Sequence, residues 1–266
     1  MSEISQLAYV HPDAKIGEGV IVKAFAYIDR DTEIGDGCVI GPHVSIHAGA
    51  RIGKNNKFFD GCIIAATPQD FRWKGEASRV VIGDNNVVRE HVIINRSIHP
   101  EGETSIGNNS FVMAQTHVGH DSKIGNWVVI GNSVKIAGAC RINDYTILSS
   151  AALVHENCEI GRWVLVKGGC RVNNNVPPFC IMAHNPITYF GVNAYLLRKG
   201  GYSEDVIDDI AKCYRHIYQS NTSTYNAVRR IAQDVADTPA RKEILDFIRD
   251  HDMKLAAISF DDGDEA

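Results

Sequence analysis

The sequence predicts a mainly β protein, a parallel β-helix of hexapeptide repeats followed by a C-terminal α-helical domain. Nearly every sixth residue from Val10 to Val172 is aliphatic or Phe, in a single register. A six-residue period is neither helical nor a simple strand alternation, and it is typical of a hexapeptide-repeat β-helix. After residue 186 the apolar residues change to helical spacing. The residues in register are Val10, Ile16, Val22, Ile28, Ile34, Ile40, Ile46, Ile52, Phe58, Ile64, Ile82, Val88, Ile94, Ile106, Val112, Val118, Ile124, Ile130, Ile136, Ile142, Leu148, Val154, Ile160, Val166 and Val172.

The residue two places before each aliphatic residue is usually small, as at Ala14, Cys38, Ser122 and Ala152. One large and one small inward side chain fit each side of a triangular coil, so roughly eighteen residues make one turn. Successive turns then stack with strands about 4.8 Å apart, and each interior strand pairs its backbone groups above and below. The pattern does not fix the hand of the coil.

Two polar insertions interrupt the register without shifting it, near residues 66–79 and 95–105. Only Asp70, Glu76 and Pro100 break the six-residue count, and all three fall in these insertions. The interrupted stretches correspond to whole sides of the prism, so we expect the insertions to bulge outward while the stack continues. We therefore assign residues 1–185 to the β-helix.

Residues 186–266 are assigned to a C-terminal helical domain. We expect Pro177 and Pro178 to close the coil, because neither can donate to a strand ladder. The helices should cover the end of the prism, where strand edges are otherwise unpaired. The acidic tail Asp261–Ala266 is expected to be disordered. The expected helices begin at Ser203, at Thr222 or Ser223, and at Thr238-Pro239.

Composition narrows the possible classes of function. The net charge of −5 argues against non-specific nucleic-acid binding. No charged leader precedes an apolar stretch and no apolar run approaches ~18 residues, so neither secretion nor a membrane span is expected. The seven cysteines lack metal-ligand spacing. We interpret them as reduced residues of a cytoplasmic protein, and five of them occupy the small inward position: Cys38, Cys62, Cys140, Cys158 and Cys170.

The segment from Thr116 to Asp121 holds the strongest candidates for chemistry. His117 precedes the core residue Val118, so its side chain should project outward, whereas His120 sits beside a corner. An imidazole with a carboxylate close by, here Asp121, is suited to act as a general base. Two alternatives stay open, a pair of surface histidines and a zinc site that His155 would complete.

The first insertion is long, polar and rich in both charges, and insertions in repeat proteins often build the binding face. Arg72 and Lys74 are cationic, and Asp70 is a hydrogen-bond acceptor. This combination suits a ligand that carries phosphates together with hydroxyl or amide groups. The alternative is a surface loop without a role in binding.

One ordered set of motifs extends over nearly the whole chain. It comprises the hexapeptide prism, Gln69-Asp70 and Gly75-Glu76, His117-x-x-His120-Asp121, Val176-Pro177-Pro178, and Phe190-Gly191-Val192-Asn193. In this order the motifs resemble the UDP-N-acetylglucosamine acyltransferases that begin lipid A synthesis. The resemblance implies a left-handed coil and a homotrimer with active sites in the clefts between neighbouring prisms. It also implies transfer of a β-hydroxyacyl chain from acyl carrier protein, a co-substrate, to the 3-hydroxyl of UDP-N-acetylglucosamine, with no metal or other cofactor.

The resemblance also implies roles by position. His120 stands at the general base that deprotonates the sugar hydroxyl, and Asp121 at the group that orients it. Gly138 matches a glycine whose backbone N–H faces the developing oxyanion, a kind of donor typically worth about 3 kcal/mol. His155 and Asn193 match residues near the nucleotide, and a glycine at Gly168 leaves room for a long acyl chain. The full set of implied substrate contacts is Asp70, Arg72, His117, His155, Glu156, Gly168, Asn193 and Lys199.

Several positions depart from the family pattern and leave the acceptor open. Arg72 stands where Lys is common, and Glu156 where Gln is usual, which adds a carboxylate near the nucleotide diphosphate. The alternatives are an acyltransferase with another acceptor, including an amino sugar that would be N-acylated, a metal-dependent enzyme of the γ-carbonic-anhydrase kind, and a non-catalytic sugar-nucleotide-binding scaffold. The other departures are Asn95 for His before Arg96, Ala139 for the His of some members, and Lys199-Gly200 for an Arg pair.

Overall fold

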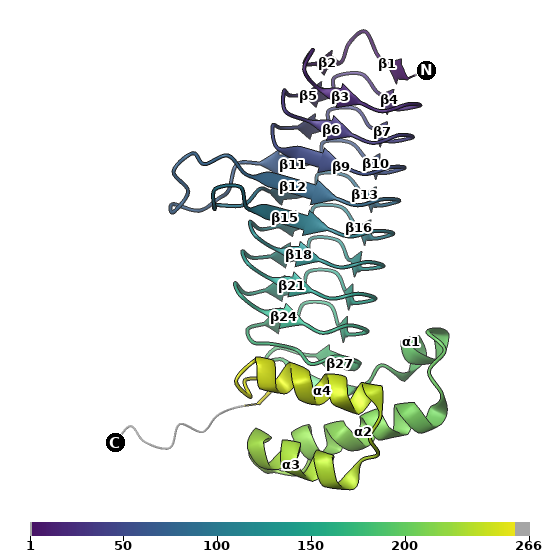
Figure 1. Ribbon diagram of the computed structural model, residues 1–266, viewed down its shortest axis with the longest axis vertical. Coiled ribbons are helices and arrows are strands. Elements are labelled where there is room, and N and C mark those ends of the chain that lie inside the picture. The colour runs from purple at the N-terminus through teal and green to yellow at the C-terminus, as the bar shows by residue number, and fades with distance from the viewer. Residues whose placement is uncertain (1, 259–266) are drawn as a thin grey trace.

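The computed structural model describes residues 2–258, which form a left-handed parallel β-helix with four helices at its C-terminal end (Figure 1). The chain visits three sheets in turn, so every third strand belongs to the same sheet. In the regular turns, paired residues are eighteen apart, as Lys15 and Glu33 are. The coil predicted from the hexads is confirmed.

Most strands of the coil are two residues long, because each side of the prism is short. The first sheet contains β1 (Glu3–Ile4), β4 (Ile21–Val22), β7 (Val39–Ile40), β10 (Lys57–Phe58), β13 (Val87–Val88), β16 (Phe111–Val112), β19 (Val129–Ile130), β22 (Ile147–Leu148), β25 (Leu165–Val166), β27 (Cys180–Ala183) and β28 (Thr188–Val192). The second sheet contains β2 (Tyr9–Val10), β5 (Tyr27–Ile28), β8 (Ser45–Ile46), β11 (Ile63–Ala66), β14 (Ile93–Asn95), β17 (His117–Val118), β20 (Lys135–Ile136), β23 (Leu153–Val154) and β26 (Arg171–Val172). The third sheet contains β3 (Lys15–Ile16), β6 (Glu33–Ile34), β9 (Ala50–Ile52), β12 (Arg79–Ile82), β15 (Glu103–Ile106), β18 (Lys123–Ile124), β21 (Arg141–Ile142) and β24 (Glu159–Ile160).

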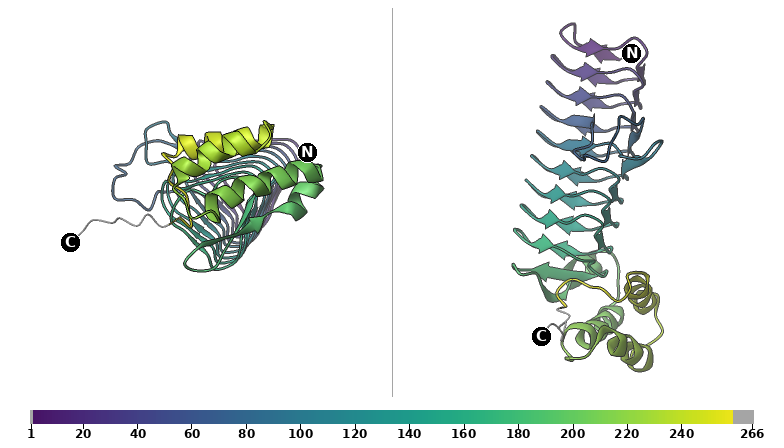
Figure 2. Two further views of the ribbon diagram at one scale, coloured as in Figure 1. Left: turned by 90° about the horizontal axis from the view of Figure 1, so that it is seen from below. Right: turned by 90° about the vertical axis from the view of Figure 1, so that its left-hand side faces the viewer.

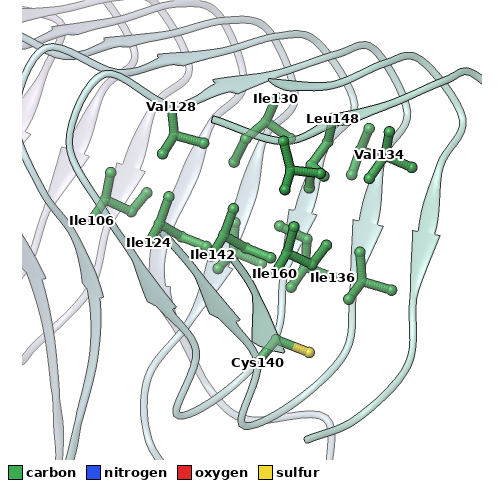
Figure 3. Close-up of a cluster of buried hydrophobic side chains, with 14 of the residues drawn as sticks. Ile106, Ile124, Val128, Ile130, Val134, Ile136, Cys140, Ile142, Leu148 and Ile160 are labelled. Atoms are coloured by element: carbon green, nitrogen blue, oxygen red, sulfur yellow. The ribbon is translucent and has the colours of Figure 1, made fainter. Parts of the chain in front are cut away.

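Inside the prism the aliphatic side chains stack from turn to turn (Figure 3). Ile124, Ile142 and Ile160 pair in register on the third sheet, and each is at most 3% exposed. The N–H of Gly125 donates to the carbonyl of Ile142, one turn further on, at 2.8 Å. Each turn is therefore held to the next by backbone hydrogen bonds and by burial of apolar surface. The seven cysteines are buried and unpaired.

Two loops leave the coil, residues 67–78 between β11 and β12 and residues 96–102 between β14 and β15. The register resumes after each loop, because Lys57 pairs with Val87, 30 residues on, and Val87 pairs with Phe111, 24 residues on. In Figure 1 the longer loop stands out from the side of the coil. Both loops connect the second sheet to the third, so they leave the prism at the same corner.

The coil does not end at Pro177 and Pro178, contrary to the expectation from the sequence. Val176 bridges to Ile160, and β27 follows the proline pair and pairs in parallel with β25. The prolines lie between these two pairings, at positions where no ladder hydrogen bond is needed from their nitrogen atoms. β28 then pairs antiparallel with β27, within the stretch that the sequence assigned to the helical domain.

Four helices follow: α1 (Ala194–Lys199), α2 (Glu204–Tyr218), α3 (Thr224–Asp234) and α4 (Pro239–Asp250). The sequence did not predict α1, a six-residue helix without a side-chain cap. The other three begin at predicted caps, since Ser203, Ser223 and Thr238 each accept a hydrogen bond from a backbone N–H of the first turn.

The helices lie across the C-terminal end of the prism, as the end-on view of Figure 2 shows. Tyr218 of α2 stacks on Tyr189 of β28, with ring centroids 4.6 Å apart. Among residues 2–258, no helix is both long and apolar enough to cross a membrane. The acidic tail Asp261–Ala266 lies outside the described residues.

Replacing Ile142 by Ala should lower the free energy of unfolding by about 2–5 kcal/mol, because Ile142 is fully buried and its neighbours in the stack cannot close the space. Equilibrium denaturation measures this change. The matched control is Arg141→Ala on the exposed face of the same strand, expected within about 0.5 kcal/mol of wild type. Equal losses in the two variants would contradict the stacked core.

Candidate active site

The turns from the second sheet to the third stack at one corner of the prism, here called the loop corner. His120, Gly138 and Glu156 follow β17, β20 and β23 and are eighteen residues apart, so they lie one above another at this corner. A cavity of about 370 Å³ opens beside them. Five predicted site residues line it, namely Asp70, His117, His120, Gly138 and Glu156, together with Gln69, Asn95 and Lys135.

The imidazole of His120 lies between two carboxylates and is only 8% exposed. Its Nδ1 is 2.8 Å from Oδ2 of Asp121, and its Nε2 is 3.3 Å from Oδ2 of Asp70. An ionised carboxylate only accepts hydrogen bonds, so Nδ1 is the donor to Asp121. In the neutral ring Nε2 then carries the lone pair. When the ring takes up a proton, Asp70 lies where it can accept the new N–H.

Asp121 is held by groups from the shorter loop and from β15. The hydroxyl of Ser97 and the N–H of Ile98, at 3.2 Å, donate to its carboxylate, and its own N–H donates to Thr104 Oγ1 at 2.7 Å. Burial opposes the charge, but the hydrogen bonds from Ser97, His120 and Ile98 outweigh it and lower the pKa of Asp121. Sequence reasoning missed Ser97 and Thr104, and the position of Ser97 in a polar insertion was the available signal.

Asp70 and Arg72 come from the longer loop. Arg72 Nε donates to both oxygens of Asp70 at 3.0 and 3.1 Å, and Nη2 donates to Oδ2 at 2.6 Å. This guanidinium holds the pKa of Asp70 well below its usual range. Arg72 Nη2 also donates to Oε1 of Glu156 at 2.8 Å. The additional carboxylate noted in the sequence is therefore paired with a cation.

Gly138 is required by the ring beside it. A Cβ at this position would lie 2.3 Å from Cε1 and 2.4 Å from Nε2 of His120, closer than real Cβ atoms approach. Only glycine therefore lets the imidazole lie against the backbone of the next turn. Within residues 2–258 the N–H of Gly138 donates no hydrogen bond, whereas the N–H of Ala139 donates to the carbonyl of His120 at 2.8 Å.

His117 lies on the outer face of β17, where its side chain meets Asn95. Its Nε2 is 2.6 Å from Oδ1 of Asn95, and Nδ2 of Asn95 donates to the carbonyl of Thr67 at 2.7 Å. Because the Asn95 amide is fixed by Thr67, its oxygen accepts from Nε2–H, which leaves Nδ1 of His117 as the acceptor. Burial, assisted by the nearby Lys135 and His120, lowers the pKa of His117.

Six predicted site residues do not line this cavity. Asp121 and Arg72 contact residues that line it, and the other four lie elsewhere. His155 lines another cavity, of about 560 Å³, with Arg171 and residues 255–258. Asn193 is buried, and its Nδ2 donates to the Trp163 carbonyl at 2.9 Å. Lys199 lies at the end of α1, with its Nζ 5.3 Å from the centre of the Tyr195 ring, and Gly168 lies in the turn before β26.

Among residues 2–258, no group of three or more His, Cys, Asp or Glu side chains is arranged to hold a metal ion.

Comparisons with known proteins show which proteins this chain resembles. The family model described as Udp N-acetylglucosamine O-acyltransferase, Domain 2, matches residues 175–255, and that described as Bacterial transferase hexapeptide (six repeats) matches residues 103–138. The acyl-(acyl-carrier-protein)–UDP-N-acetylglucosamine O-acyltransferase of Saccharophagus degradans is 42% identical over 240 residues, 89% of this chain and 93% of the relative. The protein of that name from Thermodesulfovibrio yellowstonii is 34% identical over 249 residues, 93% of this chain and 96% of the relative.

Among solved structures, the UDP-N-acetylglucosamine acyltransferase of Bacteroides fragilis matches with a TM-score of 0.90 and 42% identity, over 97% of this chain and 100% of that chain. The hexapeptide family model and these relatives place the chain in the class of hexapeptide-repeat acyltransferases. Within this class, the chain belongs to the acyl-(acyl-carrier-protein)–UDP-N-acetylglucosamine O-acyltransferase family.

The lowered pKa of Asp121 predicts how stability responds to acid. The unfolded chain binds this proton more readily, with a pKa near ~3.9, so the contribution of Asp121 is complete above about pH 5 and is lost as the pH falls through the native pKa. Asp121→Asn lacks this contribution. Its free energy of unfolding should therefore fall less steeply than that of wild type between about pH 5 and pH 2.

Urea denaturation at several pH values measures this slope. Ser97→Ala is the matched control, because it keeps the Asp121 carboxylate and removes one of its donors, so its slope should lie between those of wild type and Asp121→Asn. Parallel curves for all three proteins would contradict the assigned hydrogen bonds.

Proposed function

We propose that this protein transfers a β-hydroxyacyl chain from acyl carrier protein to the 3-hydroxyl of UDP-N-acetylglucosamine, the first step of lipid A synthesis. The observation that carries the proposal is the imidazole of His120, held by Asp121 and facing a cavity beside the free N–H of Gly138. Membership of the family supports the choice of both substrates.

His120 acts as the general base. Because Asp121 accepts the Nδ1 proton, Nε2 is the atom that takes the proton of the sugar hydroxyl as its oxygen attacks the thioester carbon. The resulting imidazolium then has an acceptor on each side, Asp121 at 2.8 Å and Asp70 at 3.3 Å. The proton passes from the ring to the leaving thiolate when the tetrahedral intermediate breaks down, which restores the base.

Gly138 stabilises the negative charge that develops on the thioester oxygen. Its N–H is a fixed backbone donor next to the His120 ring, so it requires no rearrangement at the moment of reaction. The absence of a side chain at Gly138 leaves room both for the His120 ring and for the thioester oxygen, because a Cβ would displace the ring and narrow the approach to the N–H.

The protein assembles as a homotrimer whose neighbouring prisms complete each active site. Asp70, Arg72 and His117 contact the acceptor sugar and the acyl chain from the subunit that supplies His120. His155, Gly168, Asn193 and Lys199 do not line the His120 cavity within one chain. A cleft between two prisms accounts for this, since residues at the C-terminal end of one subunit can then serve the nucleotide bound at the loop corner of its neighbour.

Acyl carrier protein is acidic, so its docking requires a basic surface despite the net charge of −5. A cavity of about 620 Å³ between α2 and α3 is lined by Lys212, Arg215, His216 and Arg230, together with one carboxylate, Asp234, and the neutral Gln219 and Ser220. We assign the docking site to this surface. The unpaired state of the seven cysteines fits the reducing cytoplasm as the place of the reaction.

Replacing His120 by Ala should lower kcat by about 10²–10⁴-fold, because it removes the imidazole that takes the hydroxyl proton. Transfer from β-hydroxyacyl-acyl carrier proteins of several chain lengths to UDP-N-acetylglucosamine measures the change. Alkali-labile product identifies an ester and stable product an amide, which separates O-acylation from N-acylation. The matched control is His11→Ala in the first turn of the coil, and undiminished turnover of His120→Ala would refute the assigned base.

The trimer predicts a sedimentation mass of about three times the 29.2 kDa of one chain. It also predicts complementation between His120→Ala and Lys199→Ala, each expected to be impaired alone. Random co-assembly leaves about one quarter of the clefts with an intact His120 and an intact Lys199 from the neighbour, so activity should return to about that fraction. Mixed trimers no more active than the two parents would refute the shared site.

A further inference from the structure

Arg72 joins the longer loop to the coil. Its Nη2 donates to Oδ2 of Asp70 at 2.6 Å and to Oε1 of Glu156 at 2.8 Å, so one nitrogen bridges two carboxylates. Asp70 and Arg72 lie in the loop after β11, whereas Glu156 follows β23, 84 residues away from Arg72. Both carboxylates line the cavity that contains His120.

The loop has a second attachment on the other side of Arg72. The guanidinium of Arg96 lies over the ring of Trp73, 5.4 Å from its centroid, and the N–H of Arg96 donates to the carbonyl of Ala66 at the base of the loop. The Trp73 contact holds the loop to the segment after β14, and the Glu156 contact holds it to a later turn. Only the Glu156 contact involves a cation that also binds Asp70.

The chemistry of the three groups makes Arg72 and Glu156 interdependent. A planar guanidinium can donate to Asp70 through two nitrogens while it also donates to Glu156, whereas the ammonium of a lysine is a single point charge on a flexible stem. Without the guanidinium, the carboxylates of Asp70 and Glu156 would face the same cavity with no cation between them, and their charges would repel each other. The low pKa of Asp70 agrees with a tightly held cation. Arg72 and Glu156, two positions at which this sequence departs from the family pattern, therefore form one ion pair with each other.

We propose that Glu156 is a positioning residue for acyl transfer. By holding Arg72 it fixes Asp70 3.3 Å from Nε2 of His120, where the Asp70 carboxylate can accept a hydrogen bond from Nε2–H during the reaction. Arg72 and Glu156 act as one clamp, so each is favourable only in the presence of the other. The kinetic consequence rests on the proposed acyl transfer, while the structural consequence, a fastened loop, does not.

The kinetic test is a double-mutant cycle with Arg72→Lys and Glu156→Gln. In the wild-type background Glu156→Gln should lower kcat by about fivefold, since a neutral amide holds the guanidinium less tightly than a carboxylate. In the Arg72→Lys background the same substitution should raise kcat by about fivefold, because it removes a carboxylate that the lysine cannot hold together with Asp70. This reversal of sign is a rescue that a merely structural role for Glu156 does not produce. Effects that multiply to within about twofold would overturn the clamp.

The second measurement needs no catalysis. Trypsin cleavage of the folded protein after Lys74, in the same loop, should be about fivefold faster in Glu156→Gln than in wild type, with unchanged melting temperature. The matched control is Glu101→Gln, which removes the same charge from the Arg79–Glu101 pair at 3.1 Å and should leave cleavage and kcat within about twofold. Unchanged cleavage in Glu156→Gln overturns the inference. If the wild-type protein transfers no acyl group, the proposed function is overturned, and the cleavage rates alone decide for or against the clamp.

Discussion

The structure depends on one constraint, that each two-residue strand must pair with the strand one turn away. Such a strand makes too few hydrogen bonds to stand alone, so the three sheets are stable only as a continuous stack. The stack fixes a spacing of eighteen residues in every turn that carries no insertion. Residues eighteen apart in the sequence therefore share a corner in space, and this places Gly138 against His120 and Glu156 beyond Gly138 without any further folding element.

The candidate active site extends this regular corner with a series of groups that alternate between donor and acceptor. Ser97 donates to Asp121, Asp121 accepts from His120, and Asp70 accepts from Arg72 on the far side of the ring. Each carboxylate has its own donors, which is why the pKa values of Asp121 and Asp70 both stay low although the two groups lie near each other. The imidazole of His120 is thereby oriented by the Asp121 carboxylate, while the Asp70 carboxylate lies on its other side.

The sequence predicted those parts of the molecule that repeat or that follow local rules. The hexads predicted the coil, and Ser203, Ser223 and Thr238 began helices because a capping side chain acts within one turn. The proline pair misled, because a missing N–H matters only at a position that must donate, and this pair lies between ladder positions. The donors to Asp121 from the shorter loop and the partner of Glu156 could not be predicted, since they depend on how two loops of irregular backbone fold back on the corner.

The division between coil and loops explains where this chain can differ from its relatives. His120 and Gly138 belong to stacked turns, so a change at either position disturbs the neighbouring turn, as the contact of a Cβ at Gly138 with the ring makes plain. Asp70, Arg72 and Ser97 lie outside the stack and have no register to satisfy. Amino-acid substitutions are therefore tolerated best where a loop contacts the coil, provided that the two partners of an ion pair change together. Ala139 is a different case, because it is exposed with a φ of 56° and its N–H donates to the carbonyl of His120, so its side chain can vary without moving the imidazole.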